Sequence, residues 1–114
     1  EGHKSIALAI SQMWKQTLGI EATLENQEWQ TFLEARGNGN FEIARAGWCG
    51  DYNEASSFLT LMVSKNTTGG QHYGSAEYDA LIEKALASTS EEERTAIYLQ
   101  AEQLLAKDMA IAPI

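Results

Sequence analysis

The stretch from Ala44 to Glu54 holds the side chains best suited to bind a ligand. It reads Ala-Arg-Ala-Gly-Trp-Cys-Gly-Asp-Tyr-Asn-Glu, so a cation, two aromatic rings, two glycines and an acid lie close together in the sequence. Glycines let a ligand approach the backbone, aromatic rings form walls, and a carboxylate in a water-poor cleft pairs with a cationic group. The pattern indicates binding, with Asp51 as the partner of a cationic group.

A structural interpretation of the same residues is also open. Asp51 would cap the helix that follows, and Glu54, three residues on, would complete an acidic capping box. Trp48 and Tyr52 would then pack into the core. The two interpretations are compatible with each other.

Two residues outside this stretch could extend the site. Trp29 and Arg36 lie on a predicted short helix, residues 28–36, and would add an aromatic wall and a second cation if the two predicted strands are neighbours. Each also has an ordinary explanation. A tryptophan on a helix face is usually part of the core, and an arginine in the last turn complements the helix dipole.

Metal, cofactor and catalytic sites are not indicated. His3 and His72 are far apart in the sequence, and Cys49 is the single cysteine, which excludes two-thiol motifs and an internal disulfide. Neither histidine belongs to a motif with Cys49 or with a serine nucleophile. Residues 37–40, Gly-Asn-Gly-Asn, lack the third glycine and the lysine of phosphate-binding loops. Cys49 is a buried small hydrophobe, a free thiol or the partner of a cysteine outside this sequence.

Composition excludes two classes of partner. Eight Lys plus Arg against sixteen Asp plus Glu give a net charge of −8, and no cluster of basic residues offsets it locally. Nucleic acid and anionic membranes are therefore poor partners. The absence of an initiator methionine and the apolar end predict an internal fragment, with residues 1–114 as a single unit.

Hydrophobic periodicity places these residues on a mixed α/β fold. Three-and-four spacing predicts helices over 3–18, 28–36 and 53–63, and alternation predicts strands over 20–24 and 41–48. Two further helices have predicted caps at Ser75 and within the run Ser88-Thr89-Ser90. The second of these helices reaches about Asp108, and the two pair as a C-terminal helical hairpin. The binding stretch thus lies where a strand leads into a helix.

Two stretches of this sequence resemble the periplasmic oligopeptide-binding proteins of ABC transporters, solute-binding protein family 5. They are Ala-Arg-Ala-Gly-Trp-Cys-Gly-Asp-Tyr-Asn-Glu-Ala-Ser-Ser-Phe-Leu at 44–59 and Asn-Gln-Glu-Trp-Gln-Thr-Phe at 26–32. The likeness continues in order to residues 98–105 and 111–114. It implies that residues 1–114 form part of the second lobe of a periplasmic-binding-protein type II fold, with helices packed on a small sheet.

The resemblance also implies a role for each candidate site residue. Asp51 would pair with the free α-amino group of a peptide, and the main chain of Gly47 and Cys49 would bond to its backbone. Trp29 and Trp48 would line side-chain pockets. Positively charged groups would meet the peptide's carboxy end; these are Arg36, Arg45 and His3. Cys49 would form a disulfide with a cysteine outside this sequence, as suits an oxidising periplasm.

The implied function is transport without catalysis. Short peptides would be bound in the periplasm and delivered to membrane permease subunits, with no cofactor. The alternatives are a relative that binds muropeptide or another small solute, a thiol-dependent peptidase that uses Cys49, and a plain structural domain. Unpaired strand edges at the cut ends further predict self-association of the fragment.

Overall fold

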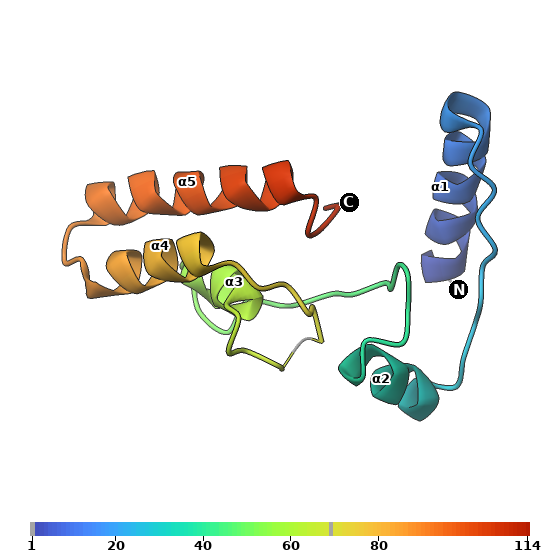
Figure 1. Cartoon of the computed structure of the whole chain (residues 1–114), viewed down its shortest axis with the longest axis horizontal. Helices are drawn as coiled ribbons and strands as arrows, with labels where there is room; N and C mark the ends of the chain where they lie inside the picture. The colour runs from blue at the N-terminus through green and yellow to red at the C-terminus, as the bar shows by residue number, and fades with distance from the viewer. Residues whose placement is uncertain (1, 69) are drawn as a thin grey trace. The chain divides into compact units, whose positions relative to one another are not determined.

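The computed structural model describes residues 2–68 and 70–114. Its contacts divide the chain into two units, Glu1–Phe32 and Leu33–Ile114, which are treated separately below. All regular elements among the described residues are helical (Figure 1). They are α1 (Gly2–Leu18), α2 (Trp29–Gly37), α3 (Ser56–Leu59), the 3₁₀ turn η1 (Thr60–Met62), α4 (Ala76–Ala87) and α5 (Glu91–Asp108).

Helix α1 makes up most of the first unit and ends where the sequence predicts. Gly19 adopts a positive φ of 69° and donates its N–H to the Lys15 carbonyl at 3.2 Å. The N–H of Ile20 reaches the Trp14 carbonyl at 3.3 Å, which completes a glycine C-cap. No residue of α1 is buried within this chain, so the predicted buried face is exposed or half-buried here.

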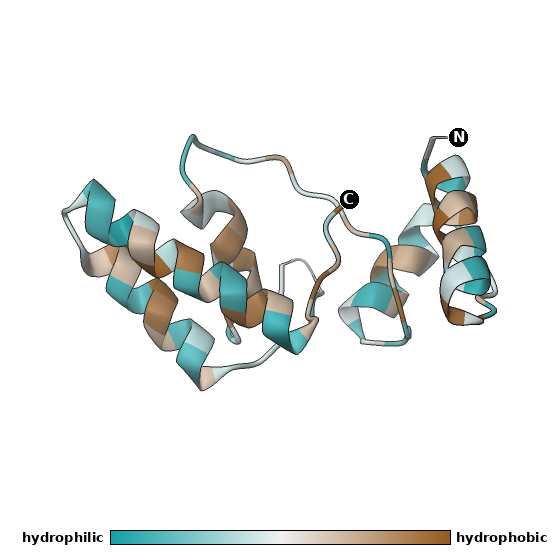
Figure 2. Ribbon diagram, turned by 90° about the horizontal axis from the view of Figure 1, so that it is seen from above, coloured by the Kyte–Doolittle hydropathy of each residue, from teal (hydrophilic) through white to brown (hydrophobic). Residues whose placement is uncertain are grey.

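The core lies in the second unit, where α4 and α5 form the predicted antiparallel hairpin and α3 packs against both (Figure 1). Hydrophobic and hydrophilic residues alternate along both hairpin helices (Figure 2). The side chains of the core come from all three helices and η1; they are Leu59, Met62, Tyr78, Ile82, Ala85, Ile97, Tyr98, Ala101 and Leu105.

Serine caps begin both hairpin helices, as predicted. The Ser75 side chain accepts the Tyr78 N–H at 3.2 Å, and the Ser90 side chain accepts the Glu93 N–H at 3.3 Å. Each bond satisfies one of the backbone donors that a helix leaves unpaired at its start. At the far end of α5, Met109 takes the left-handed conformation with φ 54°.

The two predicted strands are absent. Residues 20–24 and 41–48 contain no strand, and neither do the other residues that the structure describes. Alternating hydrophobicity fits one covered face, but a strand also needs a neighbouring backbone for its hydrogen bonds. In the described part of the chain, neither segment forms a backbone ladder with another extended segment, and the bond from the Ile20 N–H belongs to the C-cap of α1. The predicted sheet is therefore not observed.

The predicted helix over 53–63 is shorter than expected. It begins at Ser56 and gives way to 3₁₀ geometry at Thr60. The Thr60 hydroxyl donates to the Ser56 carbonyl at 2.7 Å. Residues 51–54 consequently remain a loop in front of α3.

Candidate functional site

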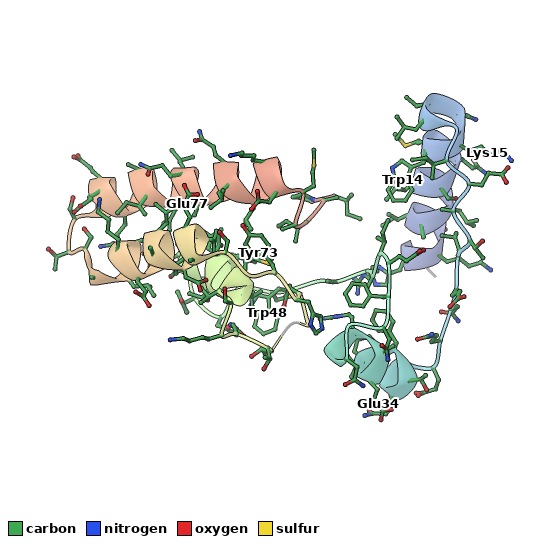
Figure 3. All side chains as sticks on the ribbon, in the orientation of Figure 1. Trp14, Lys15, Glu34, Trp48, Tyr73 and Glu77 are labelled. Carbon is green, nitrogen blue, oxygen red and sulfur yellow. The ribbon has the colours of Figure 1, made fainter. Side chains whose placement is uncertain are left out.

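The loop that leads into α3 exposes the residues singled out from the sequence. Trp48, labelled in Figure 3, is 41% exposed and Tyr52 is 52% exposed, so the expectation that both pack into the core is wrong. The thiol of Cys49 is exposed too, which removes its interpretation as a buried hydrophobe. The Asp51 side chain is also on the surface.

Asp51 does not cap α3. The N-cap is Ala55, and no side chain caps this helix. Asp51 instead donates its backbone N–H to the Ser57 hydroxyl at 2.7 Å. The capping-box interpretation of Asp51 and Glu54 is therefore wrong, because the loop continues past Asp51 and the helix begins only at Ser56. The Asp51 carboxylate is left exposed to solvent while its backbone is held.

Two glycines of the loop have close neighbours. A Cβ at Gly47 would lie 3.3 Å from Nη2 of Arg45, so the guanidinium sits beside the backbone of Gly47. A Cβ at Gly50 would lie 3.0 Å from the ring of Phe58. A larger residue at position 50 would have to push that ring away, which explains glycine there.

Glu54 has three side-chain partners. Its Oε1 accepts from Arg94 Nε at 2.9 Å and from the Tyr98 hydroxyl at 3.2 Å, while its Oε2 accepts from the Ser56 hydroxyl at 3.2 Å. Desolvation alone would raise the pKa of Glu54, but the hydrogen bonds from Ser56, Tyr98 and Arg94 and the charge of Arg94 hold it below its ordinary value.

Sequence reasoning missed Arg94 and Tyr98. They lie 40 and 44 positions from Glu54, so no local motif connects them. The available signal was their own spacing, because residues four apart on a helix share one face.

The remaining candidates lie on the first two helices. His3 is exposed on α1, and Trp29 is 60% exposed and stacks on Phe32 with ring centroids 6.0 Å apart. Both belong to the first unit. Arg36 lies in the second unit, where its carbonyl is 2.9 Å from Nε2 of His72.

A small pocket of about 100 Å³ lies elsewhere in the second unit. None of the candidate residues lines it. Its wall includes Gly37, Leu61, Ser64, Gln71, His72 and Tyr73. The exposed loop, rather than this pocket, therefore carries the candidate site.

In the described part of the chain, no helix has the length and hydrophobicity to cross a membrane.

Comparison with known proteins defines the class. Residues 1–70 match the family of bacterial extracellular solute-binding proteins, family 5 Middle. The chain belongs to this family, whose description is that of solute-binding proteins. OppA and MppA, two similar proteins, are likewise named as binding proteins, which favours a binding role over the thiol-dependent peptidase. Its structural neighbours have the periplasmic-binding-protein type II fold.

Particular relatives cover nearly the whole chain. The chain is 48% identical over 112 residues to the periplasmic oligopeptide-binding protein OppA of Escherichia coli K12, covering 98% of this chain and 21% of that protein. It is 41% identical over 114 residues to the periplasmic murein peptide-binding protein MppA of the same strain, covering 100% and 21%. The crystal structure of Haemophilus influenzae OppA in complex with RPPGFSPFR matches with a TM-score of 0.92 at 41% identity, covering 98% of this chain and 22% of that one. The chain thus spans about a fifth of the length of these relatives.

Proposed function

We propose that this chain is part of a periplasmic solute-binding protein that binds short peptides and delivers them to the permease subunits of an ABC transporter. Membership of the solute-binding family supports a binding role, and the names of OppA and MppA support peptides as the ligand class. The observation that carries the proposal is the Asp51 carboxylate, exposed on a loop whose backbone is fixed by the Ser57 hydroxyl.

In this proposal Asp51 pairs with the free α-amino group of the peptide. A carboxylate is the natural partner of an ammonium group, and the bond strengthens when the ligand excludes water from it. The main chain of Gly47 and Cys49 bonds to the peptide backbone, where the absence of a side chain at position 47 leaves room for close approach. Such main-chain recognition tolerates many peptide sequences.

The other candidate residues contact the rest of the ligand. Aromatic walls around its side chains come from Trp29 and Trp48, of which Trp48 is on the same loop as Asp51. Positive charge for the carboxy end is supplied by Arg36, Arg45 and His3. The guanidinium of Arg45 beside Gly47 supports a place for this residue near the peptide backbone.

The same proposal extends to the fold. Residues 1–114 are part of one lobe, in which 20–24 and 41–48 become strands by pairing with backbone from outside this sequence. Both segments are free of helix and alternate in hydrophobicity, as half-buried strands do. Cys49, exposed in this chain, pairs there with a second cysteine.

A murein peptide is the second candidate ligand. It is supported by the 41% identity to MppA over the whole chain. A titration in which a murein tripeptide competes with ordinary tripeptides separates the two, because only a murein-selective protein prefers the former.

The first test is calorimetric titration of the full-length gene product that carries this sequence. A tripeptide with a free amine is expected to bind and its N-acetylated form to bind much more weakly, since acetylation removes the ammonium and little else. Asp51→Asn should cost binding on the order of 2 to 5 kcal/mol, which is more than tenfold in affinity. Asp108→Asn, whose carboxylate accepts from the Tyr73 hydroxyl at 2.7 Å, is the control and should bind nearly normally.

Each other outcome points to a different error. Equal affinities for Asp51→Asn and Asp108→Asn would contradict the assignment of Asp51 as the partner of the peptide's amino group. Equal binding of free and acetylated peptide would move recognition to another part of the protein. No binding of either peptide would reject peptides as the ligand class.

A further inference from the structure

The loop in front of α3 is attached to the helices at several points. The Asp51 N–H donates to Ser57, and the Tyr52 hydroxyl lies 3.0 Å from the Ser56 hydroxyl. Both serines are almost fully buried, at 3% and 1% exposure. Their hydroxyls would be costly to leave unpaired, and the loop supplies partners to both.

Glu54 makes the connection from this loop to α5. Its side chain receives hydrogen bonds from Arg94 and Tyr98, and its Oε2 receives one from Ser56. Arg94 is fixed in turn, because its Nη1 donates to the Ser88 carbonyl at 3.2 Å, between α4 and α5. One carboxylate therefore joins the loop, the start of α3 and the hairpin.

The Glu54–Arg94 pair is partly open to solvent. The side chains are 39% and 27% exposed, so the pair by itself contributes little stability. Its contribution lies in geometry, because three donors converge on one carboxylate and restrict where the loop can go. A loop already held in its bound conformation loses less entropy when a ligand arrives.

We propose that Glu54 is a positioning residue, which acts through Arg94 and Tyr98 to hold the Asp51 carboxylate ready for the ammonium group of a peptide. The proposal rests on the proposed function and deepens it. Residue 51 is three positions before Glu54, and the Glu54 N–H closes a turn on the Tyr52 carbonyl at 3.0 Å. Release of Glu54 would free that turn.

A competing role for Glu54 is direct contact with the ammonium group. The two roles predict opposite effects of Arg94. If Glu54 bound the ligand, removing the neighbouring guanidinium would remove a competing cation and strengthen binding. If Glu54 positions the loop, removing Arg94 would weaken binding just as removing Glu54 does.

The test is a double-mutant cycle in the full-length gene product, with Glu54→Gln, Arg94→Gln and the double variant. The matched control is Glu83→Gln, because Glu83 is exposed on α4 and has no ion pair with any residue that the structure describes. A free-amine tripeptide and its N-acetylated form are titrated into each variant, and thermal midpoints are recorded alongside.

We expect each single variant to bind the free-amine tripeptide roughly three- to thirtyfold more weakly, in line with coupling energies for residues in one network. The affinity of the double variant for this peptide should be no lower than that of the weaker-binding single variant. The affinity of these variants for the acetylated tripeptide should stay at the wild-type level. The control variant Glu83→Gln should bind both peptides as the wild type does. Substitution of a residue with a merely structural role would lower the affinity for both peptides together.

Several results would overturn the proposal. These are wild-type affinity in both single variants, stronger binding by Arg94→Gln, additive losses in the double variant, and equal losses for both peptides. If the wild-type protein itself fails to distinguish the two peptides, the proposed role of Asp51 has failed, which is separable from a failure of Glu54.

Discussion

At the scale of single residues, Tyr78 shows how burial changes the chemistry of a side chain. It is fully buried in α4, and its hydroxyl donates to the Leu59 carbonyl at 2.8 Å, which links α4 to α3. Its ring also meets Tyr73 edge-on, with centroids 5.6 Å apart. Burial raises the pKa of Tyr78 well above its ordinary value of 10.0, because a phenolate would lose its hydration.

This shift predicts a loss of stability in alkali. Above pH 10 the unfolded chain releases the Tyr78 proton while the folded chain retains it, so the free energy of unfolding falls as pH rises. Tyr78→Phe should be less stable near neutrality by about 1 to 3 kcal/mol, since the Leu59 carbonyl loses its donor. It should also lose less stability between about pH 9 and about pH 11.

The measurement is thermal unfolding followed by circular dichroism across that pH range. Part of the alkaline loss should survive in the variant, because burial raises the pKa of Tyr73 and Tyr98 as well. An alkaline loss as large in Tyr78→Phe as in the wild type would contradict the role given to Tyr78.

At the scale of the element, each hairpin helix depends on its first residues. Ser90→Ala removes the acceptor for the Glu93 N–H and should lower the free energy of unfolding by about 0.5 to 2 kcal/mol. Ser90→Asn keeps a capping oxygen and should remain close to wild type. Urea unfolding followed by helical circular dichroism measures both. Equal loss in the two variants would show that the cap contributes nothing beyond the serine's own packing.

These local signals explain which elements could be predicted from the sequence. Helices α1, α4 and α5 carry their stop or start signals within their own sequence, at Gly19, Ser75 and Ser90. Strands over 20–24 and 41–48 were predicted from alternation, but pairing depends on backbone that is distant in sequence. The same limit applies to the site. Asp51 stands out through its local motif, whereas Glu54 meets Arg94 across 40 positions, so no local pattern indicates that contact.

At the scale of the whole molecule, the two units differ in what stabilises them. The unit Leu33–Ile114 has a core of side chains from α3, η1, α4 and α5, whereas α1, the main element of the unit Glu1–Phe32, has no buried residue. Most of the stability of a helix in a protein comes from the packing of its apolar face, which α1 lacks within this chain. Its apolar residues Ile6, Leu8 and Met13 are 45%, 43% and 63% exposed within this chain.

Native-state hydrogen exchange should therefore divide the 114-residue chain sharply. We expect amides of α4 and α5 to be protected through the core and amides of α1 to exchange roughly as fast as in a free peptide, because nothing is gained by keeping α1 folded. In the full-length gene product, the proposed lobe would cover the apolar face of α1, and its amides should become as slow as those of α5. Slow exchange of α1 in the 114-residue chain would show that this helix is stable without such cover. Fast exchange in both proteins would instead contradict the proposal that residues 1–114 belong to one packed lobe.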